Sequence, residues 1–292
     1  MDADLDDALD VFTTVRPRLF GIAYRMLGSA SEAEDIVQDA WLRWQGTDRG
    51  TVENPGAFLA TTTTRLAINA LQSARARRET YIGPWLPEPV DTSADPTLGA
   101  ERSEALGFAV LVMLERLTPT ERAAYVLREA FAYPYDQIAD IVQGSEAAVR
   151  QLVSRARRHL AGERKRDVAP SEQRRLLTAF LAAAQTGDLG ELERLFAEDV
   201  VSYSDGGGVV RASKFPVHGR VTVAKFVRAF HTHFWEGVTT TDAEINGQPA
   251  VLLAKDGATI AVLTVVASAD GIDQVLWMMN PHKLAAVAPR AA

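Results

Sequence analysis

Four arginines within Glu146–Leu160 are the side chains best suited to binding a polyanion. They are Arg150, Arg155, Arg157 and Arg158. Apolar residues recur at helical spacing through the same segment, which predicts a helix with one buried stripe. The stripe consists of Val149, Leu152, Val153, Ala156 and Leu160. It leaves these side chains available to a ligand: Glu146, Ala147, Arg150, Gln151, Ser154, Arg155 and Arg158.

A short predicted helix over Gln137–Val142 and a turn at Gln143–Ser145 precede this segment, and together they indicate a helix-turn-helix. In that motif the start of the second helix reaches base edges in the major groove, while arginines bind phosphates. An ordinary basic helix in a bundle has the same pattern, and spacing alone gives the two interpretations equal weight. Basic side chains continue at Arg164, Lys165 and Arg166.

Two earlier helices carry charge of opposite sign. Ser31–Trp44 is an amphipathic helix with an acidic rim, formed by Glu32, Glu34, Asp35, Gln38 and Asp39. A solvated face is the commoner interpretation of such a rim, and a surface for a basic protein partner is the sharper one. Arg65–Arg78 is basic and follows two tryptophans and a polar loop, a combination that suits single-stranded DNA. The alternative places both tryptophans in the helical core, and the spacing favours this at least for Trp41.

Caps and breakers define the helices that position these residues. The first helix runs from Asp4 to Met26 and stops at Gly28, and Ser31 with Glu34 is the predicted capping box of the second. Asn54 and Pro55 start the third helix after the loop 46–53. Later helices are predicted over Ala105–Leu117 and from Thr118, where Glu121 completes a second capping box.

The remaining chain changes character twice. Prolines 84, 87, 89 and 96 mark a linker over Tyr81–Gly99. From Pro170 the pattern predicts an α+β domain with a curved antiparallel sheet after two helices, Glu172–Gln185 and Leu189–Phe196. A further helix is predicted over Val221–Phe234. The predicted strands are Val200–Ser204, Val209–Ala212, Ala250–Ala254, Thr259–Ser268 and Ile272–Met279.

The composition of the chain excludes several kinds of site and structure. The 292 residues include no cysteine, which excludes disulfides, thiolate nucleophiles and cysteine-ligated zinc. Phe108–Leu114 and Ile260–Ala267, the most apolar stretches, are far shorter than the ~18 residues of a membrane span, so a cytoplasmic protein is expected. The net charge of −7 hides opposite local fields. Residues 1–53 carry eleven acids against five arginines, whereas residues 146–166 carry seven basic residues against two acids.

The order of these segments resembles bacterial RNA polymerase sigma factors of the extracytoplasmic-function type. The matching pieces are AEDIVQDAWLRW at Ala33–Trp44, NPGAFLATTTTRLAINAL at Asn54–Leu71, and the segment Leu117–Leu160. The resemblance implies sigma domain 2 over 1–80, a linker over 81–103, and sigma domain 4 with its helix-turn-helix over 104–166, all helical. The implied partners are promoter DNA and core polymerase, at its β′ clamp and β flap.

The resemblance also implies roles for individual residues. The surface that docks on the polymerase clamp would be Glu34, Asp35, Gln38 and Asp39. Recognition of the −10 element, with a base flipped from the non-template strand, would fall to Trp44, Asn54, Arg65, Asn69 and Arg75. Recognition of the −35 element would fall to Ser145, Ala147, Arg150, Gln151, Ser154, Arg155 and Arg158. No catalytic residue, metal or cofactor is implied.

The C-terminal part, 170–285, resembles a SnoaL-like domain of the NTF2-like fold, a fusion typical of the SigJ-type group. The supporting pieces are Ala179–Val201, Ser204–Gly208, Val275–Leu284 and the WLPEP element at Trp85–Pro89. His282 stands where the group's last motif usually has aspartate. The resemblance implies regulation in cis. We expect WLPEP to pack near Asp205–Gly208 and Asn280–Leu284. The residues concerned are Trp85, Leu86, Pro87, Glu88, Pro89, Asp205, Gly206, Gly207, Gly208, Asn280, Pro281, Lys283 and Leu284.

Two other functions remain open from the sequence. One is a one-component DNA-binding regulator that senses a small molecule in an NTF2-like pocket, and the Ala33–Trp44 segment argues against it. The other is a SnoaL-like cyclase or isomerase with a DNA-binding arm, which a His/Asp pair within about 3 Å in a closed pocket would favour. The candidate pocket residues are Tyr203, Asp205, His218, His231, His233, Trp235 and Trp277. A binding or docking domain without chemistry is the preferred interpretation.

Overall fold

The computed structural model describes residues 2–92, 107–161 and 168–287, and contacts within it define two compact units. Unit 1 comprises Met1–Glu79 and Asp95–Glu163, and unit 2 comprises Thr80–Ala94 and Arg164–Ala292. Part of the predicted linker, the start of the domain expected from residue 104, and Arg164–Arg166 lie outside the described residues. The described part of the linker, residues 80–92, belongs to unit 2 and is called the linker strap below.

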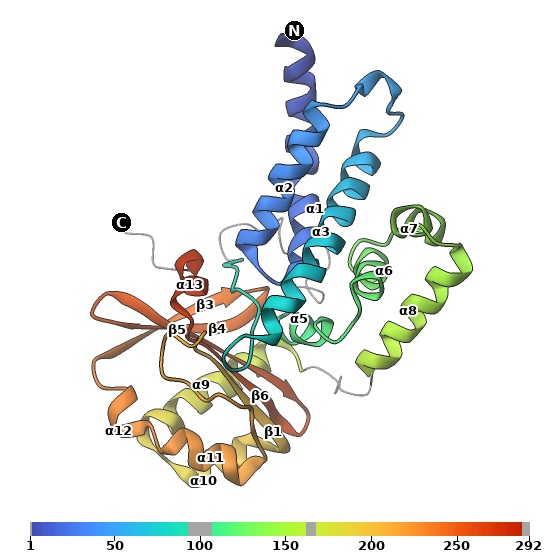
Figure 1. Ribbon diagram of the computed structural model, residues 1–292. Coiled ribbons are helices and arrows are strands. Elements are labelled where there is room, and N and C mark those ends of the chain that lie inside the picture. The colour runs from blue at the N-terminus through green and yellow to red at the C-terminus, as the bar shows by residue number, and fades with distance from the viewer. Residues whose placement is uncertain (1, 93–106, 162–167, 288–292) are drawn as a thin grey trace. The chain divides into compact units, whose positions relative to one another are not determined.

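The N-terminal half of unit 1 is made of three long helices that lie side by side (Figure 1). They are α1 (Asp2–Leu27), α2 (Ala30–Gln45) and α3 (Pro55–Glu79), with a 3₁₀ turn η1 at Arg49–Thr51. Asn54 caps α3 as predicted, because its Oδ1 accepts the Ala57 N–H at 3.0 Å. The predicted cap of α2 is wrong by two residues. Ser29 has extended backbone angles and accepts the Glu32 N–H at 3.1 Å, whereas Ser31 already lies in the first turn.

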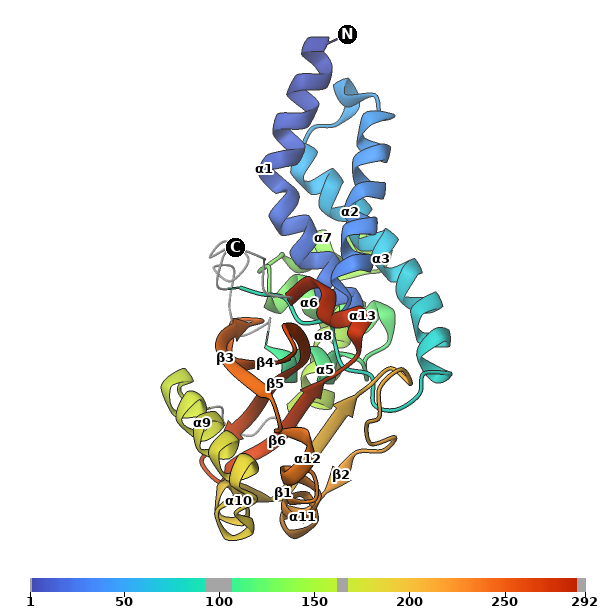
Figure 2. The same ribbon diagram turned by 90° about the vertical axis from the view of Figure 1, so that its left-hand side faces the viewer.

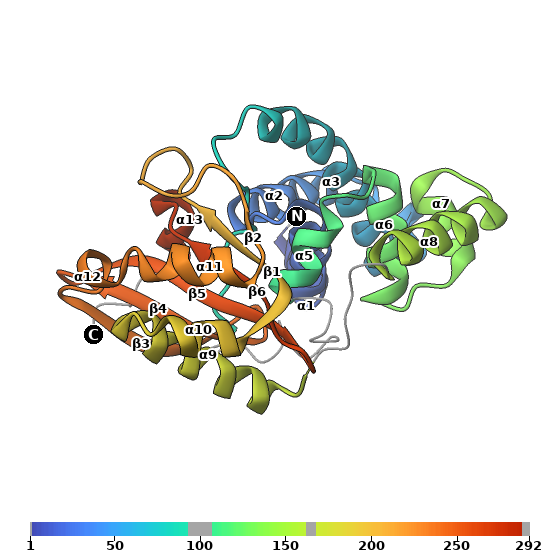
Figure 3. The same cartoon turned by 90° about the horizontal axis from the view of Figure 1, so that it is seen from below.

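In the second half of unit 1, the described residues 107–161 form four shorter helices (Figure 3). They are α5 (Phe108–Leu114), α6 (Pro119–Glu129), α7 (Tyr135–Val142) and α8 (Glu146–Ala161). The predicted capping box of α6 is confirmed: the Thr118 hydroxyl accepts the Glu121 N–H at 3.3 Å, and the Glu121 carboxylate accepts the Thr118 N–H at 3.1 Å. Two backbone donors at the helix start are satisfied in this way.

Unit 2 is an α+β domain built on a six-stranded sheet in the order β2-β1-β6-β5-β4-β3. Its strands are β1 (Phe196–Asp205), β2 (Val217–His218), β3 (Val238–Ile245), β4 (Gln248–Lys255), β5 (Ala258–Ser268) and β6 (Gly271–Met278). Its helices are α9 (Pro170–Thr186), α10 (Leu189–Leu195), α11 (Arg220–Arg228), α12 (His231–Phe234) and α13 (Pro281–Leu284), followed by a 3₁₀ turn η3 at Ala285–Val287. The helices α9 to α12 gather on one face of the sheet (Figure 2).

The sheet differs from the predicted one in three respects. It is mixed, because β1 and β6 pair in parallel. The predicted strand Val209–Ala212 is absent, since the N–H groups of Val209 and Val210 bond back to the Gly206 carbonyl and form a turn. Strand β3 was missed because most of its residues are polar and exposed, as suits an edge strand. The single predicted helix Val221–Phe234 is divided into α11 and α12.

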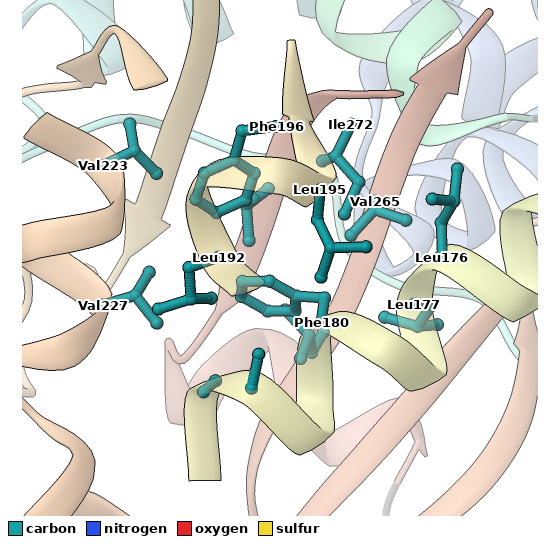
Figure 4. Packing of buried hydrophobic residues seen from close by; sticks show 14 of the residues in the cluster. Leu176, Leu177, Phe180, Leu192, Leu195, Phe196, Val223, Val227, Val265 and Ile272 are labelled. Atoms are coloured by element: carbon teal, nitrogen blue, oxygen red, sulfur yellow. The ribbon is translucent and has the colours of Figure 1, made fainter. Parts of the chain in front are cut away.

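The core of unit 2 lies between these helices and the sheet (Figure 4). Phe180 of α9 is fully buried and packs against Phe196 at the start of β1, with ring centroids 5.9 Å apart. Leu192 of α10 and Val223 of α11 are also fully buried in this cluster. The apolar core lies on one face of the sheet. The loops at the ends of β1 and β6 lie outside it and can carry polar groups. None of the helices in the described ranges is long and apolar enough to cross a membrane.

Candidate functional site

The helix-turn-helix predicted from the sequence is present in unit 1. Helix α7 ends at Val142, Gln143 adopts the left-handed conformation with φ of 57°, and the Gly144 N–H bonds to the Ala139 carbonyl at 2.9 Å. The positive φ therefore falls on Gln143 and not on the neighbouring glycine. The Ser145 hydroxyl accepts the Ala148 N–H at 3.2 Å and starts α8. The two helices pack through buried Ile138, Val149 and other apolar residues.

One face of α8 is exposed along its length and is lined with hydrogen-bond donors. All seven residues predicted to contact the −35 element are exposed. Five of them line an open groove: Arg150, Gln151, Ser154, Arg155 and Arg158. Arg150 pairs with Glu146, and its guanidinium stacks 4.3 Å from the Tyr135 ring centroid, which restrains the side chain. Such a face can bind phosphates and present donors to base edges.

The acidic residues of α2 also share one exposed face. Glu34, Asp35, Gln38 and Asp39 are all exposed, while the opposite face of the helix is buried. Glu34 forms an ion pair with Arg16 of α1 at 2.6 Å. The rim therefore keeps most of its negative charge available to a partner in solution.

Trp44 is buried in the described conformation, which agrees with the alternative that places it in the helical core, and its contact with the −10 element stays a prediction. Its side chain is only 2% exposed, and its Nε1 donates to the Ala8 carbonyl at 3.1 Å. Trp41, which the spacing favoured for the core, is half-buried against Phe12. Both tryptophans face α1. Trp44 is the more deeply buried of the two because its indole also bonds to the α1 backbone.

The other residues predicted to contact the −10 element all lie on or beside α3. Asn54 and Asn69 are exposed, and Asn54 acts as the cap of the helix. The Arg65 guanidinium donates to the carbonyls of Ile141 and Asp140, at 3.0 and 2.8 Å, and so caps the C-terminus of α7. Arg75 lies on α3, and its side chain is outside what the structure describes.

A cluster of buried arginines escaped the sequence analysis. Arg25 is 2% exposed and Arg122 is 1% exposed, and Arg122 Nε donates to the Arg25 carbonyl at 2.8 Å. The Glu115 carboxylate accepts from Arg122 at 2.5 Å and also pairs with Arg78. Burial lowers the pKa of Arg78, and Glu115 opposes that shift. These arginines were missed in the sequence because helical periodicity cannot show that an arginine is buried next to a carboxylate from a distant segment.

In unit 2 the linker strap is held by one carboxylate. Asp205, at the end of β1, is fully buried. Its Oδ1 accepts the Tyr81 hydroxyl at 2.5 Å and the Gly207 N–H at 3.1 Å, and its Oδ2 accepts the Leu86 N–H at 2.8 Å. Leu86, Pro87 and Pro89 are buried. The expected packing of WLPEP on the Asp205 motif is thus confirmed.

The C-terminal motif completes this site. Lys283 Nζ is 2.8 Å from Asp205 Oδ2, donates to the Leu86 carbonyl at 2.5 Å, and lies 4.2 Å from the Trp85 ring centroid. Asn280 donates to the Tyr81 hydroxyl at 2.9 Å. Burial, and then the hydrogen bond to Asp205, raise the pKa of Tyr81, so its hydroxyl stays protonated and donates.

The remaining predicted residues of this site have supporting positions. Gly207 has φ of +61°, and a Cβ there would collide with the Asn280 side chain, so glycine is required. Gly206 is buried, Gly208 is exposed, and Glu88 is half-buried. Pro281 begins α13, and Leu284 is buried near its end. His282 is exposed, and only its backbone N–H bonds to Asn280, so the missing aspartate leaves this arrangement in place.

The far end of the strap pairs with the edge of the sheet. The Val90 N–H donates to Asn246 Oδ1 at 3.0 Å, and the Asn246 N–H donates to the Val90 carbonyl at 2.8 Å. The Thr92 N–H bonds to the Glu244 carbonyl at 3.1 Å. The strap therefore covers the open edge at β3 as well as the Asp205 site.

A cavity of about 200 Å³ lies between the helices and the sheet of unit 2. Aromatic rings from α11, α12 and β6 line it, with Ser204, Arg211 and Ser213 as its polar members. Of the seven pocket residues considered from the sequence, Trp235 and Trp277 line it. Asp205 is used by the strap site, and His218 and His233 are exposed. The described residues that line it include no histidine, aspartate or glutamate.

Comparisons with known proteins agree with the geometry of both units. The family description Sigma-70 region 2 matches residues 11–77, and Sigma-70, region 4 matches residues 108–160. The chain is 36% identical to the ECF RNA polymerase sigma factor SigJ of Mycobacterium tuberculosis over 93% of this chain and 91% of the relative. It is 32% identical to that organism's probable ECF sigma factor SigI over 92% of each chain. The crystal structure of SigJ superimposes with a TM-score of 0.77 and 29% identity, covering 97% of this chain and all of that one.

Proposed function

This chain belongs to the extracytoplasmic-function family of RNA polymerase sigma factors, and on that basis we propose how its two units divide the work of promoter recognition. Unit 1 binds core polymerase through the acidic face of α2 and promoter DNA through α3 and α8. Unit 2 controls that activity in cis through the linker strap. Core polymerase and promoter DNA are the proposed partners, and the cytoplasm is the proposed place of action.

The exposed face of α8 is the observation that carries the DNA-binding half of the proposal. Its arginines lie on one side of a helix-turn-helix whose other side is buried, so a duplex can approach without disturbing the core. Arg150 and Gln151 lie near the start of α8, and we assign them to base edges, while Arg155 and Arg158, further along the same face, are assigned to the phosphate backbone.

The linker strap supports the regulatory half. It connects the two parts of unit 1 in sequence, and unit 2 binds it through Asp205, Lys283 and the β3 edge. The length of chain between residues 79 and 107 limits how far apart the two DNA-binding parts can move. Docking of the strap holds residues 80–92 on unit 2 and so shortens the length available, and release of the strap restores it.

The test is transcription from a promoter of this chain with purified core polymerase and the full chain. Arg150→Ala should reduce the promoter-specific transcript about 10-fold or more, in line with ~1–3 kcal/mol for a specific base contact. Arg174→Ala, an exposed arginine on α9, is the matched control and should leave the transcript unchanged. Loss of every promoter-specific transcript with the unaltered chain would overturn the assignment.

The polymerase surface and the strap need separate variants. Asp35→Arg with Asp39→Arg should weaken core binding in a pull-down, whereas Glu236→Arg, an exposed acid of unit 2, should not. Trp85→Ala and Asp205→Ala should change transcription non-additively when combined, since both act on one contact. Simple addition of the two effects would defeat regulation by the strap.

A further inference from the structure

We propose that the unit 2 cavity binds a small one-ring aromatic acid, and that the bound acid strengthens docking of the linker strap. The binding half stands on the cavity alone. The regulatory half rests on the proposed function, because the strap matters to transcription only if unit 2 acts in cis.

The size and lining of the cavity set the apolar part of the ligand. A dry cavity of about 150 Å³ lined by aliphatic and aromatic side chains can bind benzene. The cavity here is about 200 Å³, which leaves room for one ring and a short substituent. Phe234, Trp235 and Trp277 contact one another as edge-to-face or tilted rings, with centroids 5.0 to 6.3 Å apart. Such rings favour a flat aromatic guest.

The polar groups of the cavity indicate the charge of the ligand. Arg211 is the charged side chain among the described residues that line it, and it is exposed at the edge. A guanidinium at this cavity, with no carboxylate among the described residues that line it, matches an anion.

The wall of the cavity is shared with the strap site. Ser204 and Met279 line the cavity, and the Met279 N–H donates to the Asp205 carbonyl at 2.8 Å. The loop that carries Arg211 folds back on Gly206, where an added Cβ would lie 2.6 Å from the Val210 carbonyl oxygen. On the outside of the same wall, a Cβ at Gly83 of the strap would lie 3.6 Å from the Ser213 carbonyl oxygen.

Because the wall is shared, ligand binding and docking of the strap should favour each other. A ligand that binds Arg211 and the aromatic rings favours the conformation in which the loop 204–213 is in place. That conformation also positions Asp205 and the Gly206–Gly208 turn that hold the strap. Binding and docking therefore favour the same state, and each should strengthen the other.

Binding is tested by titrating the full chain with phenylacetate, 2-phenylethanol and 2-phenylethylamine, which share a ring and differ in charge. Calorimetry should show phenylacetate binding about 5- to 10-fold more tightly than the alcohol, and the amine more weakly than both. Arg211→Gln should remove the preference for the acid, and Arg174→Gln should keep it. Equal affinities for the three compounds, or no binding of any, would overturn the ligand class.

Coupling is tested by hydrogen exchange of the strap amides with and without saturating phenylacetate. The acid should slow exchange across residues 81–92, and at the Leu86 amide above all, by several-fold. The Arg211→Gln chain should show no such slowing at the same phenylacetate concentration. Unchanged or faster exchange in the saturated wild-type chain would refute the coupling. Neither experiment contains polymerase, so failure here leaves the transcription result standing, and the reverse also holds.

Discussion

Asp205→Asn is the substitution that tests the strap site most directly. It keeps the size and shape of the side chain and removes its charge. The carboxylate is fully buried and accepts hydrogen bonds from Tyr81, Leu86, Gly207 and Lys283. An amide offers one acceptor oxygen in place of two, and it no longer balances the ammonium of Lys283, which is 7% exposed.

The expected magnitude follows from that burial. Removing one partner of a buried ion pair costs about 3–5 kcal/mol. Opening the strap exposes the Lys283 ammonium to water and relieves the cost, so the loss should appear as easier opening of the strap before global unfolding. At about 1.4 kcal/mol for each factor of ten, exchange of the Leu86 amide should accelerate ~100-fold or more.

Hydrogen exchange of the full chain, resolved to the peptide that covers residues 81–92, measures this effect. Asp242→Asn, which neutralises an exposed acid on β3, is the matched control and should leave strap exchange unchanged. Adding Lys283→Met to Asp205→Asn should recover part of the protection, because the buried ammonium is then gone. Exchange within threefold of wild type in Asp205→Asn would refute the assignment of Asp205 as the centre of the site.

Three further results are expected from the described contacts. Gly207→Ala should loosen the strap in the same exchange assay, because its Cβ meets the Asn280 side chain and its φ of +61° disfavours alanine. Glu115→Gln should destabilise unit 1 by about 2–4 kcal/mol in urea unfolding, since the buried Arg122 and the half-buried Arg78 lose a partner, whereas Glu129→Gln in an exposed pair should cost under about 1 kcal/mol. Although burial opposes it, hydrogen bonds from Thr118 hold the pKa of Glu121 below its ordinary 4.5. Its stabilisation of α6 should therefore be complete above that pH and should be lost as the pH falls through the lower folded value, which an acid titration of helical circular dichroism can follow.

Local signals predicted unit 1 well where side chain and backbone interact within one turn. The Thr118–Glu121 capping box and the Asn54 cap depend on residues three positions apart, and the bond that closes the turn at Gln143–Ser145 spans five. The exposed face of α8 was also predictable, because a helical period assigns each residue a side. The cap of α2 was misplaced, since Ser29 and Ser31 offer the same hydroxyl and only the backbone angles choose between them.

Contacts between distant segments could not be predicted in the same way. The depth of Trp44 depends on α1, and the capping of α7 by Arg65 joins residues 75 positions apart. Strand β3 carries too few apolar residues to be recognised, and its place at the edge is set by pairing with β4. The parallel pairing of β1 with β6, and so the mixed sheet, is likewise decided by the path of the chain between them.

Helical periods and charge patterns were enough to predict which segments are helical and which faces are acidic or basic, and the family resemblance pointed to WLPEP, the Asp205 motif and the C-terminal motif. Their meeting around one buried carboxylate, with Lys283 between Asp205 and the strap, depends on the folded arrangement of unit 2. Desolvation explains this dependence. A carboxylate acquires this role only when folding removes it from water and supplies enough donors to compensate, and that depends on side chains from three distant parts of the chain.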